Sequence, residues 1–216
     1  MQIIDTSRSV LENLYYLSGV LILISIVIGL RQLYLTKSTL EINSKREAAS
    51  LAAKQVEVYT TRIIPLLNKV FFEEQRQKVI HFDVEVDEFK ASALIKNMGE
   101  EKYQAAILER IKICTIVLEA INAMEAFSVY FIKEVADEEI AFSSVGRTFT
   151  KSVESLYFDI SCVLADDNDK SFQNLIKLYD MWSKRLKKER LERDKEGLTK
   201  QIENIQSLKV KPIGTK

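Results

Sequence analysis

Three polar residues stand out in a stretch that is otherwise apolar. Glu119, Asn122 and Glu125 follow one another at intervals of three residues, so they form a narrow polar stripe if this stretch is helical. A buried carboxylate needs an ion pair or hydrogen bonds. The basic residues that could approach the stripe are Lys112, Arg147 and Lys151. We expect either an internal network that sets how the helices pack or a pocket for a ligand or a partner protein.

The other residue types that often carry chemistry are too few to build a familiar site. The sequence has one histidine, His81, and two distant cysteines, Cys114 and Cys162. A Ser-His-Asp triad, a zinc site of His and Cys, or a di-iron helix bundle would need more of them. Glycine-rich phosphate-binding motifs are also absent. We therefore predict no enzyme, no cofactor and no metal site, and two free, buried thiols rather than a disulfide.

The stretch from Asn13 to Leu30 contains no charged residue and is strongly apolar. At about 1.5 Å per residue it is long enough to cross most of a hydrocarbon core roughly 30 Å thick. Tyr15, Tyr16 and Tyr34 lie where aromatic rings prefer the membrane interface. The pattern predicts a transmembrane helix over residues 13–30, with the lipid bilayer as its partner.

The basic residues around this segment indicate its orientation. Arg8 alone precedes the segment, whereas Arg31, Lys37, Lys45 and Arg46 follow it closely. By the positive-inside rule, the carboxyl-terminal side faces the cytoplasm, and residues 1–12 form an external segment. The first residues lack the features of a cleaved signal peptide, so we expect the anchor to be retained.

The rest of the chain has the composition of a helical protein. Only two prolines and six glycines occur, and Leu, Ile, Lys, Glu and Ala are frequent. The fold class predicted is all-α, with the transmembrane helix continuing into one cytoplasmic helical bundle. The 31 basic and 31 acidic residues balance, which argues against a nucleic-acid partner.

We divide the part after the span into three regions. Residues 31–64 are a juxtamembrane helix, residues 65–196 the helical bundle, and residues 197–216 a carboxyl-terminal helix and tail. Apolar positions such as Leu40, Ala52 and Tyr59 recur along the juxtamembrane helix, which favours packing against its own domain over a homo-oligomeric coiled coil. Pro65 should interrupt the helical hydrogen bonding.

Within the bundle, residue patterns predict the individual elements. Residues 80–87 alternate apolar and polar side chains and form either a short strand or an extended connector. Residues 102–133 should form one central helix, covered on several sides. Asp137 should cap a short helix that turns at residues 143–146, and a further helix should span residues 147–164. The last helix should open near Ser171 and end at Gly197.

The segment from Lys184 to Arg193 is rich in charge. Its basic residues outnumber its acidic ones, which suits a lipid headgroup or nucleic acid. However, Glu189, Glu192 and Asp194 lie at pairing distance from the bases along a helix. This pattern favours a solvated helix over a membrane-surface patch.

The stretch Ile121-Asn-Ala-Met-Glu-Ala-Phe-Ser128, followed by Glu134-Val-Ala-Asp-Glu-Glu139, resembles a family of small bacterial membrane-anchored helical proteins of unknown function. The matching positions, which extend to about residue 182, are Asn122, Glu125, Asp137, Tyr179 and Trp182. Residues 80–87 depart from the family's pattern, which leaves the middle of the comparison open. The resemblance implies a prophage or mobile-element setting and a part in phage exclusion or defence.

These patterns lead to two hypotheses for function. The first is a non-enzymatic protein-interaction module, anchored in the bacterial inner membrane, that binds a protein partner not yet identified. The alternative is a membrane-perturbing effector, activated when its transmembrane helices oligomerise. Ser18, Gly19, Ser25 and Gly29 are small enough for close packing, but the glycines do not have Gly-x-x-x-Gly spacing.

Overall fold

The computed structural model describes the backbone of residues 2–79, 88–164 and 171–206, and the side chains of these ranges between residues 14 and 203. All regular structure in this described part is helical, which confirms the all-α prediction. The segment 80–87, a strand or connector by its pattern, lies outside the described residues. The chain divides into two units, Met1–Ala48 and Ala49–Lys216.

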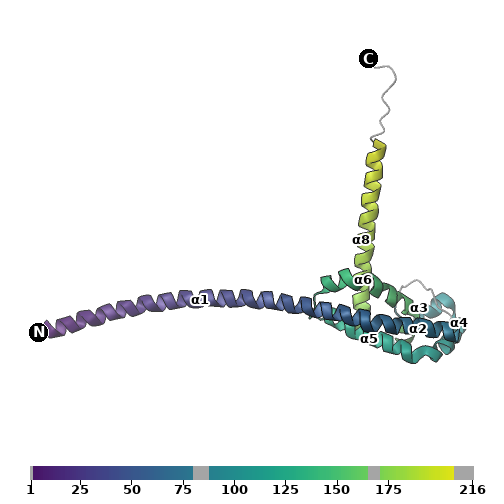
Figure 1. Ribbon diagram of the computed structural model, residues 1–216, viewed down its shortest axis with the longest axis horizontal. Coiled ribbons are helices and arrows are strands. Elements are labelled where there is room, and N and C mark those ends of the chain that lie inside the picture. The colour runs from purple at the N-terminus through teal and green to yellow at the C-terminus, as the bar shows by residue number, and fades with distance from the viewer. Residues whose placement is uncertain (1, 80–87, 165–170, 207–216) are drawn as a thin grey trace, which may run out of the picture. The chain divides into compact units, whose positions relative to one another are not determined.

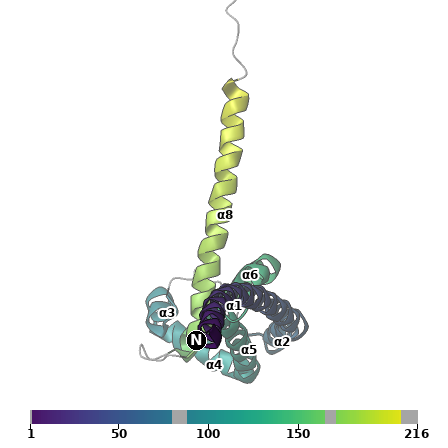
Figure 2. The same cartoon turned by 90° about the vertical axis from the view of Figure 1, so that its left-hand side faces the viewer.

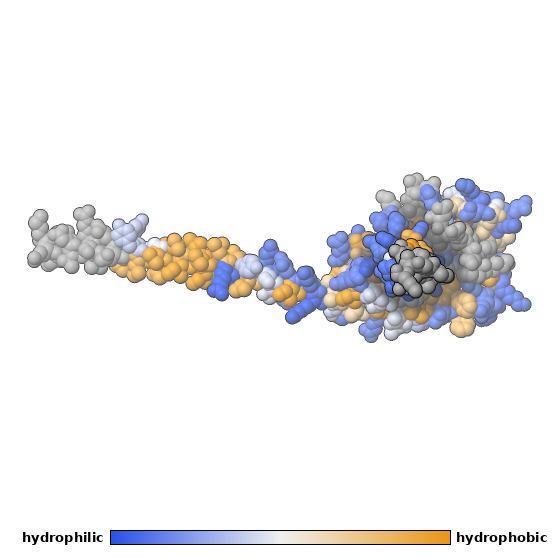
Figure 3. Space-filling view, turned by 90° about the horizontal axis from the view of Figure 1, so that it is seen from above, coloured by the Kyte–Doolittle hydropathy of each residue, from blue (hydrophilic) through white to orange (hydrophobic). Residues whose placement is uncertain are grey.

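The first unit belongs to helix α1, which spans Gln2–Val58 (Figure 1). The large apolar side chains from Leu14 to Leu30 are all exposed and form the apolar band that Figure 3 shows on this helix. Two helical stretches of the described chain, Leu14–Gln77 and Glu100–Ile132, are long and apolar enough to cross a membrane. The most apolar 18 residues of the first stretch include no buried residue, whereas 39% of the most apolar 18 residues of the second stretch are buried.

The second unit begins with the end of α1 and a wide helical turn. The turn η1 (Tyr59–Ile63) is a π-helix, and it leads directly into α2 (Ile64–Gln77). Pro65 lies in the first turn of α2, where a missing backbone N–H is tolerated. The interruption predicted at Pro65 is thus a change from the π-helical turn η1 to the α-helix α2, and the chain stays helical through it. Ala52, Tyr59 and Ile63 are buried in the second unit, as expected for a helix that packs against its own domain.

The predicted helix over residues 102–133 is divided in two. Helix α3 (Ala91–Met98) ends at Gly99, whose φ of 87° suits glycine. Helix α4 (Glu100–Arg110) then passes through the 3₁₀ turn η2 (Ile111–Ile113) into α5 (Cys114–Ile132). The tighter turn re-aims the buried face, so α4 packs with α3 while α5 packs against α2 and α8. Periodicity did not reveal this because apolar residues such as Ile107, Leu118 and Ile121 recur at helical spacing on both sides of the turn.

The predicted turn at residues 143–146 is wrong. Helix α6 runs unbroken from Glu138 to Ser155, and the predicted cap is confirmed because Asp137 Oδ1 accepts a hydrogen bond from the Ile140 N–H at 3.2 Å. The predicted helix 147–164 breaks at Leu156, after which α7 (Tyr157–Val163) follows. The hydroxyls of Ser143 and Ser144 donate to the Ile140 carbonyl within the same helix, so both serines find a partner without ending it.

The predicted end of the last helix at Gly197 is also wrong. Helix α8 spans Gln173–Gln206, and Gly197 lies within it. Figures 1 and 2 show the first half of α8 among the helices of the second unit, while its second half has no neighbouring helix in the described part of that unit. Trp182, on the first half, is fully buried against the rings of Phe127, Phe131, Phe142 and Phe149.

Two helical glycines should respond to alanine with opposite signs. A Cβ on Gly146 would lie 2.8 Å from Cδ2 of Phe142, whose ring is held by Trp182 and Arg185. Alanine there should lower the free energy of unfolding by roughly 1 kcal/mol, since overpacking outweighs the gain in helix propensity. Nothing lies within 4 Å of a Cβ placed on Gly197. Alanine there should therefore raise the free energy of unfolding by about 0.5–1 kcal/mol. Urea denaturation of both variants tests this, and a stabilising Gly146→Ala contradicts the packing described.

Candidate functional site

The predicted polar stripe of α5 is divided between two environments. Steps of three residues rotate a side chain by about −60° each, so Glu119 and Glu125 differ by roughly 120° around the helix. Glu119 and Asn122 are exposed, whereas Glu125 is half-buried. Helix α5 buries one face, made of Val117, Ala120, Ile121, Met124, Phe127, Ser128 and Phe131. The predicted stripe is therefore not one buried network.

Glu119 and Asn122 line a groove between the end of α1, η1 and α5. The groove has a volume of about 420 Å³. Its walls also carry Gln55 and Arg62 from one side and Tyr130 from the other. The remaining lining residues are Val58, Ile63, Ala123, Ala126 and Phe127. The floor is thus apolar, and the rim offers one guanidinium, one carboxylate and two amides, a combination suited to holding a peptide segment.

Glu125 has a structural partner instead. Its Oε2 accepts a hydrogen bond from the Leu175 N–H at 2.7 Å, and its Oε1 accepts one from Asn174 Nδ2 at 2.6 Å. These donors lie in the first turn of α8, where backbone N–H groups lack helical partners and the helix dipole favours negative charge. Glu125 of α5 therefore caps α8 and fixes where α8 docks.

The divided stripe gives a direct prediction. Glu125→Gln should lower the free energy of unfolding by about 0.5–2 kcal/mol, because a charged cap at a helix start becomes neutral. Glu119→Gln, on the same helix but exposed, should change it by less than about 0.5 kcal/mol. Thermal denaturation of the two variants provides the comparison. Equal effects would contradict the separate roles.

A buried charge cluster lies where α2, α4 and α7 meet, and residue patterns did not reveal it. Arg110 donates from Nη1 to Glu74 Oε1 at 2.5 Å and from Nε to Asp159 Oδ1 at 2.8 Å, and its Nη2 also bonds Asp159. All three residues are at most 7% exposed. They lie 36 and 49 positions apart in the sequence, so no local spacing links them.

Burial and pairing oppose each other in this cluster. Burial acts to lower the pKa of Arg110, but hydrogen bonding and charge attraction from Asp159 and Glu74 outweigh it and leave the pKa above its ordinary value. Burial also raises the pKa of Asp159, and Arg110 offsets only part of that rise. Arg110 and Asp159 also line a small neighbouring cavity, but the three guanidinium nitrogens of Arg110 and both carboxylate oxygens of Asp159 already take part in hydrogen bonds within the cluster, which fits a structural role.

A small apolar cavity of about 120 Å³ lies beside the cluster and contains both cysteines in its wall. The two thiols are free, as predicted, but they are not both buried: Cys114 is exposed and Cys162 is half-buried. Cys114 begins α5 just after the 3₁₀ turn, which brings it to the surface. Burial raises the pKa of Cys162 to about 11, so this thiol stays protonated at neutral pH and is a poor nucleophile.

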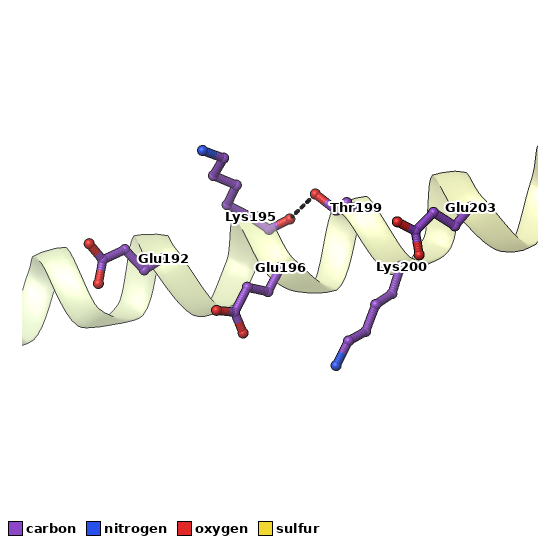
Figure 4. A pocket seen from close by; sticks show the side chains of 6 residues that line it. All are labelled: Glu192, Lys195, Glu196, Thr199, Lys200 and Glu203. Carbon is purple, nitrogen blue, oxygen red and sulfur yellow. Dashed lines mark hydrogen bonds between the residues drawn. The ribbon is translucent and has the colours of Figure 1, made fainter.

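A second surface hollow, on α8, carries no site. Figure 4 shows that its walls are side chains of one helix alone: Glu192, Lys195, Glu196, Thr199, Lys200 and Glu203. The Thr199 hydroxyl donates to the Lys195 carbonyl within that helix, at 2.9 Å. Among the described residues no second element encloses the space, so nothing there excludes water from a ligand.

Metal ligands do not cluster in the described residues, because no three His, Cys, Asp or Glu side chains lie close enough to share an ion. His81 lies outside them. The residues that carry the family resemblance serve mainly the fold: Asp137 and Glu125 cap helices, Trp182 fills the core, and Tyr179 bonds Glu154 at 3.4 Å. No protein-family model, curated protein or solved structure matches this chain.

Proposed function

We propose that this chain is a membrane-anchored protein-interaction module, with residues 13–30 in the bilayer and its helical bundle in the cytoplasm. The supporting observation is the run of exposed apolar side chains from Leu14 to Leu30. At roughly 25 cal/mol per Å², leaving so many large apolar side chains in water would be very unfavourable, and lipid would remove that cost. The basic residues from Arg31 to Arg46 support the orientation.

The groove beside Glu119 and Asn122 is the surface we assign to the partner. Arg62 and Glu119 offer opposite charges over an apolar floor, so a short amphipathic segment with both charges fits it best. Anchoring would raise the local concentration of the bundle and a membrane-associated partner, which strengthens a modest contact. The resemblance adds phage exclusion as the setting in which to test this role.

Anchorage and orientation are tested together. In cell fractionation, the full chain should remain in the membrane after salt and alkaline washing, and a variant lacking residues 1–35 should become soluble. A cytoplasm-dependent reporter fused to Lys216 should be active. A soluble full chain, or an exported reporter, contradicts the proposal.

Photo-crosslinking tests the groove. A photoreactive residue at position 122 should give a specific adduct that is lost on adding Glu119→Arg, whereas position 151, exposed on α6, should give none. Measuring the membrane potential after expression is induced distinguishes the interaction module from the alternative, a membrane-perturbing effector. Depolarisation that requires the span but not the groove favours an effector that perturbs the bilayer.

A further inference from the structure

The second half of α8 combines two features that rarely occur together in a free helix. Between residues 187 and 203 its side chains are exposed or half-buried, so it does not contribute to the core. Yet it carries three large apolar side chains, Leu191, Leu198 and Ile202, which are 59%, 60% and 55% exposed. A helix that needed only solvation would carry polar residues at these positions.

These three side chains lie on one line. At about 100° per residue, Leu191, Leu198 and Ile202 fall within a sector of roughly 40°. Lys187 lies on one side of this sector, and Lys188 and Lys195 lie on the other, each within about 60° of Leu191. The apolar line therefore has Lys188 and Lys195 along one edge, and Lys187 beside Asp194 along the other, so lysines outnumber acids at its borders.

All but one of the acidic residues between positions 187 and 203 occupy a different sector, and the exception, Asp194, lies about 60° from Leu191 on the side of Lys187. By the same geometry, Glu189, Glu192, Glu196 and Glu203 all fall between about 100° and 160° from Leu191. Figure 4 shows Lys195 and Glu196 on opposite sides of α8, with Lys200 on the same side as Glu196. Although the whole chain has no net charge, three lysines and one aspartate border the apolar line of this helix, and the four glutamates lie away from it.

Ion pairs along the helix leave this pattern in place. Arg185 pairs with Glu189 at 3.7 Å and Lys188 with Glu192 at 3.9 Å, both four residues apart. Such exposed pairs stabilise a helix only slightly. They do not cover the apolar line, which still needs an occupant.

A second copy of α8 is a poor occupant. Two helices paired along Leu191 and Leu198 would bring Lys188 and Lys195 into the seam, at the heptad positions that face the partner. The repeated lysines would repel each other at two levels. An anionic surface, by contrast, would attract them.

We propose that residues 187–203 of α8 bind the surface of an anionic lipid bilayer, with Leu191, Leu198 and Ile202 inserted between headgroups. Lys187, Lys188 and Lys195 would extend their stems along the apolar side chains and place their ammonium groups among lipid phosphates. The four glutamates would face the water. The inference rests on the proposed anchorage only in that the anchor brings α8 to lipid.

Hydrogen exchange of the full chain tests this inference. The chain would be reconstituted in vesicles of phosphatidylcholine alone and of phosphatidylcholine with phosphatidylglycerol, and exchange followed at residues 187–203. Slower exchange is expected only with the anionic lipid and should disappear in high salt. The variant K187Q/K188Q/K195Q should lose this protection, because each lysine contributes about fivefold to binding of an anionic surface.

A second triple variant, with the same net charge as K187Q/K188Q/K195Q, serves as the control. R190Q/R193Q/K200Q removes three charges from the other faces of α8, and it should retain the protection. Equal exchange in the two lipids, or equal losses in the two triple variants, overturns the proposal. If protection from exchange depends on protein concentration and not on lipid charge, the proposal is overturned, and a second copy of the chain covers α8 instead. If the full chain does not float with vesicles in a density gradient, the proposed anchorage is contradicted, not the role of α8. Hydrogen exchange of that soluble chain with added vesicles then tests α8 alone.

Discussion

Replacing Arg110 by methionine should lower the free energy of unfolding by about 3–5 kcal/mol. Methionine keeps much of the side-chain volume but removes the guanidinium that bonds both Glu74 and Asp159. Two carboxylates at most 7% exposed would then face each other without this cation. Thermal denaturation followed by circular dichroism should show a Tm lower by roughly 10 °C for a domain of this size.

An exposed pair provides the control. Lys112 bonds Glu109 at 2.6 Å but is 45% exposed, so Lys112→Met should cost less than about 1 kcal/mol. Replacing Glu74, Arg110 and Asp159 together by apolar residues should recover much of the lost stability, since no unpaired charge would remain. If Arg110→Met were as mild as Lys112→Met, the cluster would not be buried as described.

Truncating Trp182 to alanine should have a similar effect, about 3–5 kcal/mol. Its ring lies 4.9 Å from that of Phe149 and 5.8 Å from that of Phe142, measured between centroids, and it is fully buried. Its Nε1–H donates to Glu138 Oε1 at 2.5 Å, so truncation also removes a charge-assisted hydrogen bond. The resulting cavity would lie between α5, α6 and α8, where rigid rings prevent collapse.

A substitution at the neighbouring Met181 serves as the control, because it changes helix propensity with little effect on core packing. Met181 precedes Trp182 in α8 but is 39% exposed, and Met181→Ala should cost less than about 1 kcal/mol. Trp182→Phe should fall between the two, because it keeps an aromatic ring but loses the bond to Glu138. Unfolding in urea should be followed by circular dichroism in all three variants. Trp182 is the only tryptophan, so its replacement removes the tryptophan fluorescence that would otherwise report unfolding. Equal costs for Met181→Ala and Trp182→Ala would contradict a core centred on this ring.

Residue patterns predicted most helices but not where they break. Val153, Ile160 and Leu175 have other apolar residues three or four positions away in the sequence, and all three are buried, as such spacing indicates for one face of a helix. The errors at residues 143–146 and at Gly197 share one cause: serine and glycine weaken a helix only slightly, and packing or helical continuity outweighs that preference. At Gly146 the missing side chain leaves room for the ring of Phe142, one turn earlier in the same helix.

The candidate site was predicted only in part for a similar reason. The spacing of Glu119, Asn122 and Glu125 correctly marked polar residues on an apolar helix, but a helix rotates such residues into different surroundings. Which of them faces the groove depends on where η1 and α8 pack. Local sequence carries no information on that.

By itself, the amino-acid sequence determined the helical class and the uncharged apolar segment of residues 13–30, because composition and periodicity act locally along the chain. Only the tertiary structure decided that Arg110 meets Glu74 and Asp159, and that Glu125 caps α8. These partners lie 36 to 50 residues apart. They meet because burying the apolar faces of α2, α4, α5, α7 and α8 brings them together, and a buried charge must then find its partner.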